Sequence, residues 1–385
     1  MSIVQYKSNT QDEPILQDIH NHLTQSVAQW YGEGSRLGTS QPEIRSYRNC
    51  FILRYAVTTS GGHDKHILVK IRRNPKMDSL WRAVAADLHA NIPTEYRSLD
   101  FVFRSLAGVD GGIGVIRPLA YIETYHAIVM EEYPSRTLRQ ILIDQRSSRH
   151  GVAGSELEDA ARKTGKWLYY FHHYVHTPEE VPFSRHDILQ TAEVYAEKLE
   201  RVSRARVHAQ SIMDALSRRL QHVHIDSILF SQSHADMTCD NALYSNDKKV
   251  CVIDIKTRPA PIYSDLGLIL THPETFKPQI FSGGRYLSEA LLKEYRTAIL
   301  NGYFGDRVEE DNLIQTYSAL KVLDKWTMYE ELMSRYKGMK HLLSIPAGPF
   351  VTAYFQRTFR KHLDSIRATG IQPAFKVAKP ADPAL

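Results

Sequence analysis

Two acidic residues and one amide lie close together in the second half of the chain. Asp236 precedes Asn241 by five residues, and Asp254 follows a short apolar run. Magnesium commonly takes one or two oxygen ligands from a protein and fills its remaining positions with water and phosphate oxygens. A neighbouring carboxylate is suited to accept a proton from a hydroxyl group. These residue types therefore predict a magnesium site with a general base beside it.

The residues between these groups predict a β-hairpin. Apolar runs flank the polar stretch Ser245-Asn-Asp-Lys248, which is typical of a tight turn between two strands. Pairing Asn246 with Lys249 around a two-residue loop would place Asn241 directly opposite Asp254. Cross-strand neighbours have Cβ atoms about 4.5–5.5 Å apart, so both side chains would reach one cation. We expect Asp236 in the loop that enters this hairpin.

The first 130 or so residues predict a small α+β unit with an antiparallel sheet. Residues 48–57 and 66–72 are rich in β-branched and aromatic side chains and flank a Thr-Ser-Gly-Gly turn, which indicates a hairpin. An amphipathic helix is expected between residues 93 and 108, followed by two strands within 113–132. Residues 1–44 are interpreted as an N-terminal extension containing a short helix and a loop.

The pattern changes after residue 132. Residues 133–136 resemble a linker, and helical periodicity dominates from Leu138 onwards, except in a β-rich stretch at 241–255. The expected organisation is therefore an extension at 1–44, a β-containing unit at 45–132, a mainly helical unit at 133–370 and a disordered tail at 371–385.

The order of these features resembles the aminoglycoside phosphotransferase and choline kinase-like family. His234-Ala-Asp236, Asn241 and Asp254 resemble its catalytic and metal-binding loops. Lys70 resembles its phosphate-binding lysine, and Glu95 resembles the ion-pair partner of that lysine. The resemblance covers roughly residues 45–270 and implies a bilobal protein-kinase-like α+β fold, with a small antiparallel β N-lobe and a mainly α C-lobe.

This resemblance implies an ATP- and Mg²⁺-dependent phosphotransferase that acts on a hydroxyl group of a small molecule. Lys70 would hold the α- and β-phosphates, and Glu95 would orient it. Asp236 would be the catalytic base, and Asn241 and Asp254 would bind magnesium. The structural supports of the catalytic loop would be His234 and Asp265, and the hinge that contacts adenine would include Glu131 and Tyr133.

The sequence departs from the family pattern at two places. Ala235 stands where the family usually has glycine, and no glycine-rich phosphate loop is evident, because the corresponding stretch reads Arg45-Ser-Tyr-Arg-Asn49. Phosphate contacts there are expected from Ser46, Arg48 or backbone amides. Lys256, two residues after the metal-binding aspartate, has no role that the sequence indicates.

Two other readings compete with a small-molecule kinase. A catalytically weak pseudokinase or scaffold would keep the fold without turnover, although the retained Lys70 and Asp236 argue against it. A metal-dependent phosphohydrolase of HD type is suggested by His172 and His176, spaced i, i+4, and by the pair His186-Asp187. Histidines in an aromatic helix more often pack or form hydrogen bonds, which favours the kinase reading.

Composition limits the partners and the location. Three cysteines without CxxC spacing suit a reducing compartment, and no stretch approaches the roughly 20 apolar residues of a membrane span, so we expect a cytoplasmic protein. A net charge of +5 spread over helices favours no nucleic-acid partner. Aromatic residues after Asp265 and balanced charges favour a neutral or anionic, sugar-like acceptor over a polycationic aminoglycoside. The oligomeric state is not indicated.

Overall fold

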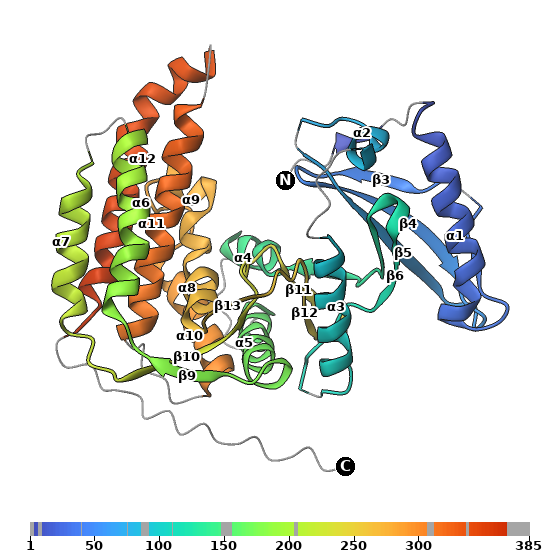
Figure 1. Cartoon of the computed structure of the whole chain (residues 1–385), viewed down its shortest axis with the longest axis horizontal. Helices are drawn as coiled ribbons and strands as arrows, with labels where there is room; N and C mark the ends of the chain where they lie inside the picture. Colours follow the sequence, from blue (N-terminus) through green and yellow to red (C-terminus); the bar gives the residue numbers. More distant parts are fainter. Residues whose placement is uncertain are drawn as a thin grey trace. The chain divides into compact units, whose positions relative to one another are not determined.

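The chain divides into two compact units. The computed structural model describes residues 4–6, 10–39, 41–74, 76–85, 92–109, 111–147, 156–203, 207–305, 312–335 and 339–367. One unit comprises Met1–Thr137 and Asn241–Thr257, and the other comprises Leu138–Asp240 and Arg258–Leu385. We call them the N-terminal unit and the helical unit (Figure 1). The antiparallel sheet of the N-terminal unit and the mainly α architecture of the helical unit confirm the predicted bilobal α+β class.

Alternating side chains give the main sheet of the N-terminal unit two different faces. Its strand order is β1-β3-β4-β5-β7-β6, and β2 pairs with β4. In the predicted hairpin of β4 (Cys50–Thr58) and β5 (Asp64–Arg72), Phe51 pairs with Ile71 and Ile52 pairs with Lys70. Successive residues of a strand point to opposite faces. The apolar face is therefore that of Phe51 and Ile71, and Lys70 lies on the other face.

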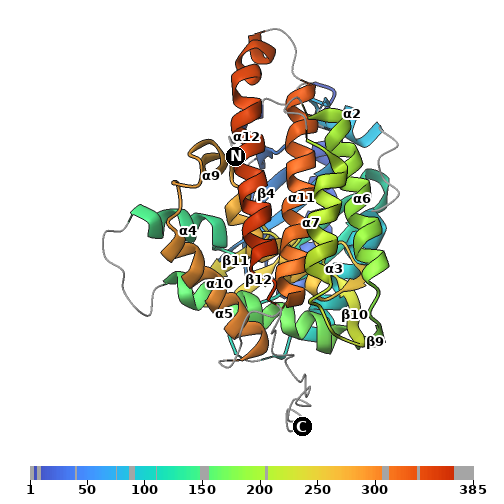
Figure 2. The same ribbon diagram turned by 90° about the vertical axis from the view of Figure 1, so that its left-hand side faces the viewer.

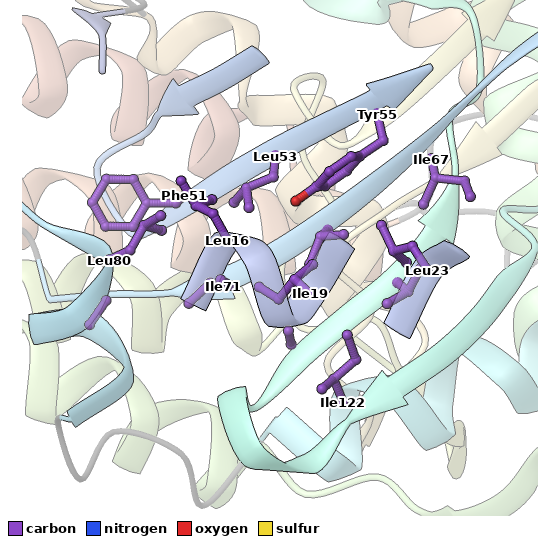
Figure 3. Packing of buried hydrophobic residues seen from close by; sticks show 14 of the residues in the cluster. Leu16, Ile19, Leu23, Phe51, Leu53, Tyr55, Ile67, Ile71, Leu80 and Ile122 are labelled. Atoms are coloured by element: carbon purple, nitrogen blue, oxygen red, sulfur yellow. The ribbon is translucent and has the colours of Figure 1, made fainter. Parts of the chain in front are cut away.

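Helix α1 (Glu13–Tyr31) covers the apolar face of this sheet. Figure 3 shows Leu16, Ile19 and Leu23 against side chains of the strands. The helix has 19 residues and belongs to the core, so the prediction of an extension with a short helix was wrong. Its buried residues Leu16, Ile19, Leu23 and Val27 are spaced i, i+3, i+7, i+11, a helical signal that the sequence contained and the interpretation missed.

A three-stranded sheet joins two distant segments in the N-terminal unit. Its order is β12-β11-β8, with β8 at Ser135–Thr137, β11 at Ala242–Ser245 and β12 at Val250–Val252. The expected linker at 133–136 is therefore partly a strand, and the β-rich stretch expected at 241–255 belongs with the N-terminal unit, which includes Asn241–Thr257. The expected boundaries at 44/45 and 132/133 differ from these units for the same reason. The expected tail at 371–385 lies outside the described residues.

The helical unit is built around long packed helices. Figures 1 and 2 show α6, α7, α11 and α12 side by side. Helix α11 (Asn312–Ser334) also packs closely on α8 (Tyr263–Thr271), because a Cβ atom added at Gly267 would lie only 2.8 Å from backbone atoms of Tyr317. A small sheet of order β13-β10-β9 accompanies these helices. No helix in the described part of the chain combines the length and apolar character needed to cross a membrane.

The remaining elements complete both units. In the N-terminal unit they are β1 (Val4–Gln5), β2 (Arg36–Leu37), β3 (Glu43–Ser46), α2 (Leu80–Ala85), α3 (Ile92–Leu106), β6 (Pro118–Ile122), η1 (Glu123–Tyr125) and β7 (Ala127–Glu131). In the helical unit they are α4 (Leu138–Ser147), α5 (Glu156–Tyr170), η2 (Phe171–Val175), β9 (Glu179–Pro182), α6 (Arg185–Val202), α7 (Ala209–Leu220), β10 (Ser227–Ser233), β13 (Arg258–Pro261), η3 (Pro273–Thr275), α9 (Lys277–Phe281), α10 (Glu289–Phe304) and α12 (Met339–Asp364).

Candidate active site

A buried lysine in the N-terminal unit contacts two carboxylates. Lys70 is 6% exposed and lies on β5, opposite the apolar face of the sheet. Its Nζ lies 2.7 Å from Oε1 of Glu95, which is on α3, and also contacts Oδ1 of Asp254. Arg72, two residues along the same strand face, donates from Nε to Oε2 of Glu95 at 2.8 Å. The ion pair expected between Lys70 and Glu95 is therefore present.

Opposite charges favour the ionised forms of Lys70 and Asp254. Burial by itself lowers the pKa of Lys70, but the negative charges of Asp254 and Glu95 outweigh burial and raise that pKa. Burial likewise opposes ionisation of Asp254, yet the nearby Lys70 lowers the pKa of that carboxyl, with smaller contributions from Arg72 and Lys256. Lys256, which had no expected role, thus adds positive charge beside the Asp254 carboxylate.

The hairpin that carries Asn241 and Asp254 has a different register from the predicted one. Leu243 pairs with Cys251, and the backbone NH of Ile253 donates to the carbonyl of Asn241 at 3.0 Å. Asn241 is therefore opposite Ile253, and the expectation that it directly faces Asp254 was wrong. The turn has three residues rather than two, since Ser245 bonds to Lys249 and Lys248 adopts φ 58°.

Asp254 itself lies just outside the strand. Strand β12 ends at Val252, and Asp254 adopts φ 60°, a conformation that few non-glycine residues occupy. Such residues are found preferentially at functional sites, where the surrounding contacts hold them in place. Here the contact with Lys70 is one such restraint. The aspartate and Asn241 remain one register position apart at the same end of the hairpin.

In the helical unit, the carboxylate of Asp265 organises the loop that contains Asp236. Asp265 is 1% exposed and accepts hydrogen bonds from the backbone NH of His234 at 2.6 Å and of Ala235 at 3.1 Å. It also accepts from Ser233 Oγ at 2.8 Å. Burial opposes the charge of Asp265, but the hydrogen bond and charge of His172, the charge of His234 and the Ser233 hydroxyl lower its pKa to about 2. The ionised carboxylate therefore fixes the backbone directly before Asp236.

The backbone of this loop favours glycine at the position after His234. Ala235 adopts φ 65°, in the left-handed region that glycine occupies without steric cost. Its NH is directed to Asp265 and to Ser233 Oγ, and the next NH, of Asp236, donates to Nδ1 of His234 at 3.3 Å. His234 is completely buried. The half-buried Asp236 side chain is thus carried by a backbone that is restrained from several sides.

The far end of the same loop is held by His272, which the sequence did not single out, and by Tyr295, one of the aromatic residues expected near the acceptor. The NH of Cys239 donates to Nδ1 of His272 at 3.1 Å, and the Cys239 thiol lies 3.2 Å from the hydroxyl of Tyr295. Burial lowers the pKa of His272 to about 3, helped by the charges of Lys325 and Arg139, so its ring is neutral at pH 7 and accepts this bond. Loop residues 233–239 are therefore fixed at both ends.

His172 also supports the loop and does not form a metal centre. Its Nε2 lies 3.1 Å from Oδ2 of Asp265 and its Nδ1 lies 2.9 Å from the hydroxyl of Tyr303. His186 and Asp187 are exposed in the first turn of α6. Among the described residues no group of three or more His, Cys, Asp or Glu side chains could hold a metal ion, so the HD-type arrangement is not formed. The sequence singled out His172, but as a possible metal ligand and not as a support of the loop; it lies in the π-helical turn η2.

The residues expected around a nucleotide lie on the N-terminal unit. Ser46 ends β3 and is half-buried, and Arg48 is exposed in the turn before β4. Glu131, at the end of β7, contacts Lys65 at 2.5 Å. The hydroxyl of Tyr133 lies 3.1 Å from Ser245 Oγ, so this side chain links the hinge segment to the β11–β12 hairpin. Both side chains are therefore engaged within the N-terminal unit.

Comparison with known proteins identifies the fold. No protein-family model and no curated protein matches the sequence. A glucosamine kinase structure shares 12% identity, with 89% of this chain and 83% of that chain covered and a TM-score of 0.50. A choline/ethanolamine kinase family protein from Mesorhizobium loti shares 13% identity over 91% and 99% of the two chains, with a TM-score of 0.49. The chain therefore has the protein-kinase-like fold that the sequence resemblance implied.

Proposed function

From this fold, we propose that the chain is an ATP- and Mg²⁺-dependent phosphotransferase that moves the γ-phosphate of ATP to a hydroxyl group of a small molecule. The observation that carries the proposal is the buried Lys70 in contact with both Glu95 and Asp254. A charged lysine is costly to bury, and these two carboxylates stabilise it in a fixed position on β5. A lysine ammonium group held in one position can bind the negatively charged phosphates of a nucleotide.

The residues of the N-terminal unit would bind the nucleotide and the metal. Lys70 would contact the α- and β-phosphates, with Glu95 orienting it, while Asn241 and Asp254 would supply oxygen ligands to magnesium. When bound, magnesium would neutralise charge on the phosphate oxygens. Asp254 would exchange part of its contact with Lys70 for the metal. The nearby contacts to phosphate and adenine would come from Ser46, Arg48, Glu131 and Tyr133.

The loop of the helical unit would supply the base. Asp236 would accept the proton of the acceptor hydroxyl as its oxygen forms a bond to the γ-phosphorus and the bond from that phosphorus to the bridging oxygen of ADP breaks. The products are ADP and a phosphate monoester. His234 and Asp265 would act as positioning residues, since their hydrogen bonds set the backbone on which Asp236 is carried. The acceptor is proposed to be sugar-like, in line with the name of the similar glucosamine kinase structure.

Release of ADP tests this function. Purified protein with MgATP and a panel of hydroxylated metabolites and saccharides should release ADP, and Asp236→Asn should lower kcat by about 10²–10⁴-fold, the usual contribution of a general base. Asp187→Asn is the matched control because Arg185-His-Asp187 has a similar local sequence but lies exposed at the start of α6. Equal loss in both variants, or no ADP release at all, would contradict the proposed activity.

Nucleotide binding can be measured separately through a native thiol. Cys50 is half-buried and pairs with Arg72, so it shares the strand face of Lys70, whereas Cys239 and Cys251 are completely buried. Burial raises the pKa of Cys50 to about 11, so labelling should be slow and faster at alkaline pH. MgATP should protect Cys50 from alkylation, with Cys50→Ala as the blank. Protection without any turnover would favour a scaffold over an enzyme.

A further inference from the structure

Helix α11 runs alongside the segment that anchors the Asp236 loop. The rings of Tyr317 and Tyr263 stack with centroids 6.0 Å apart, which places the start of α11 beside the start of α8. Three turns later, the hydroxyl of Tyr329 donates to the carbonyl of Thr275 at 3.3 Å. Between these two contacts, α11 must pass the end of α8 and His272, whose ring accepts the NH of Cys239.

Two lysines lie on this same face of α11. Lys321 and Lys325 follow Tyr317 at i+4 and i+8, and Tyr329 completes the series at i+12, so all four share one stripe of the helix. Both lysines are half-buried. Within the described part of the chain, no hydrogen bond or ion pair within 4.0 Å is found for either lysine, although the charges of Asp265 and Asp324 act on Lys321 from a longer distance. Like charges at i, i+4 destabilise a helix, and the two acidic groups that act on Lys321, Asp265 and Asp324, do not outweigh its burial and the repulsion from Lys325 and Arg258.

Positive charges around Lys321 oppose the attraction of the nearby acidic groups. Burial lowers the pKa of Lys321, and the attraction of Asp265 and Asp324 does not restore it, because Arg258 and Lys325 repel the same ammonium. Lys325 also acts with Arg139 to lower the pKa of His272. The guanidinium of Arg139 is already paired with Asp240 at 3.1 Å. Lys321 acts on Asp265 and Lys325 acts on His272, and these two groups bond the backbone at the two ends of the loop that carries Asp236.

We propose that Lys321 and Lys325 bind an anionic group of the acceptor, a carboxylate or a phosphate. The inference rests on the proposed phosphotransferase function and narrows its acceptor to a hydroxyl compound with a negative charge. A carboxylate or phosphate held by two ammonium groups gains charge-assisted hydrogen bonds and removes the repulsion between the lysines. A polycationic acceptor would be repelled by the same pair.

Matched pairs of small molecules test the charge preference without nucleotide. Calorimetric titration of the full-length protein should show tighter binding of glucuronate and glucose 1-phosphate than of glucose, and of glycerol 3-phosphate than of glycerol. Lys321→Gln and Lys325→Gln should each weaken binding of the anionic members by about tenfold, the loss expected for one charge-assisted contact. Lys293→Gln is the control, since Lys293 is exposed on α10 of the same unit and should leave these affinities unchanged.

The outcomes separate this inference from the proposed function. If anions bind no better than their uncharged partners, or if the lysine variants bind them like the control, the inference is overturned even when ADP release succeeds with uncharged acceptors. Selective, lysine-dependent anion binding in a protein that never releases ADP would keep the anion site and overturn the phosphotransferase. Should the variants raise the KM for ATP while leaving anion affinity intact, the lysines contact nucleotide phosphates and the acceptor assignment is wrong.

Discussion

At the scale of single residues, the loop before Asp236 has an alanine in a backbone conformation that favours glycine. Ala235 adopts φ 65°, which costs a non-glycine residue about 1–2 kcal/mol. Glycine would remove this cost but would add about 0.5–1 kcal/mol of unfolded-state entropy. We therefore expect Ala235→Gly to raise the free energy of unfolding by a few tenths to about 1 kcal/mol, measured by urea denaturation.

At a second alanine, the same substitution should change the free energy of unfolding in the opposite direction. Ala215 lies inside α7, where alanine is the most favourable residue, and Ala215→Gly should lower the free energy of unfolding by about 1 kcal/mol. The contrast matters because both variants remove one methyl group. If Ala235→Gly destabilised the protein as much as Ala215→Gly, the Ala235 methyl group would be contributing packing that exceeds its backbone strain.

At the scale of elements, helix α1 is expected to be essential to the N-terminal unit. Leu23 is completely buried between this helix and the sheet. Leu23→Ala should lower the free energy of unfolding by about 2–5 kcal/mol, because it removes apolar burial and leaves a cavity. Gln25→Ala, on the exposed side of the same helix, should change it by less than about 0.5 kcal/mol. Equal, small effects would make α1 the dispensable extension that the sequence suggested.

Elements with local signals could be predicted, and elements that depend on distant partners could not. The β4–β5 hairpin and α3 follow from alternation and helical spacing within a few residues, and both are present. Strand β8 exists because it pairs with β11, more than 100 residues later, so a linker was predicted there instead. The hairpin register depended on Lys248 adopting φ 58°, which no residue type in the turn demands.

The same distinction between local signals and distant partners applies to the candidate site. Lys70 and Glu95 could be found from their order in the chain, and they do form an ion pair. The supporting contacts of His172, His272 and Arg72 join segments that the sequence does not connect, so they were missed or left open. Roles in nucleotide and metal binding remain predictions for all site residues.

At the scale of the whole molecule, the chain passes between the two units at three places. The crossings follow Thr137, Asp240 and Thr257, so neither unit is one continuous segment. Contiguous boundaries such as 45–132 and 133–370 cannot describe such a chain, since a fragment cut after Thr137 would lack β11, the strand that pairs with β8. Asp236 and Asn241 therefore belong to different units although only five residues separate them.

The acid stability of the protein should depend on a buried carboxylate far from the candidate site in sequence. Glu274, in η3, is 2% exposed and lies 2.7 Å from Nε2 of His362 on α12, with Lys361 at 3.2 Å. Burial opposes its charge, but His362 and the neighbouring cations lower its pKa from 4.5 to about 2. A carboxyl whose pKa is lower in the folded state stabilises the fold above its ordinary pKa, and this contribution disappears as the pH falls from about 4.5 to about 2.

The size of this effect can be read from the slope of stability against pH. A lowering of this size corresponds to a contribution on the order of 3 kcal/mol, lost between about pH 5 and pH 2. Glu274→Gln cannot titrate, so its free energy of unfolding, measured by urea denaturation at each pH, should fall less steeply across that range than that of the wild type. Glu179→Gln, exposed on β9, should keep the wild-type slope. Parallel curves for all three proteins would mean that Glu274 is not ionised in the folded state, and that its contact with His362 is a hydrogen bond between neutral groups.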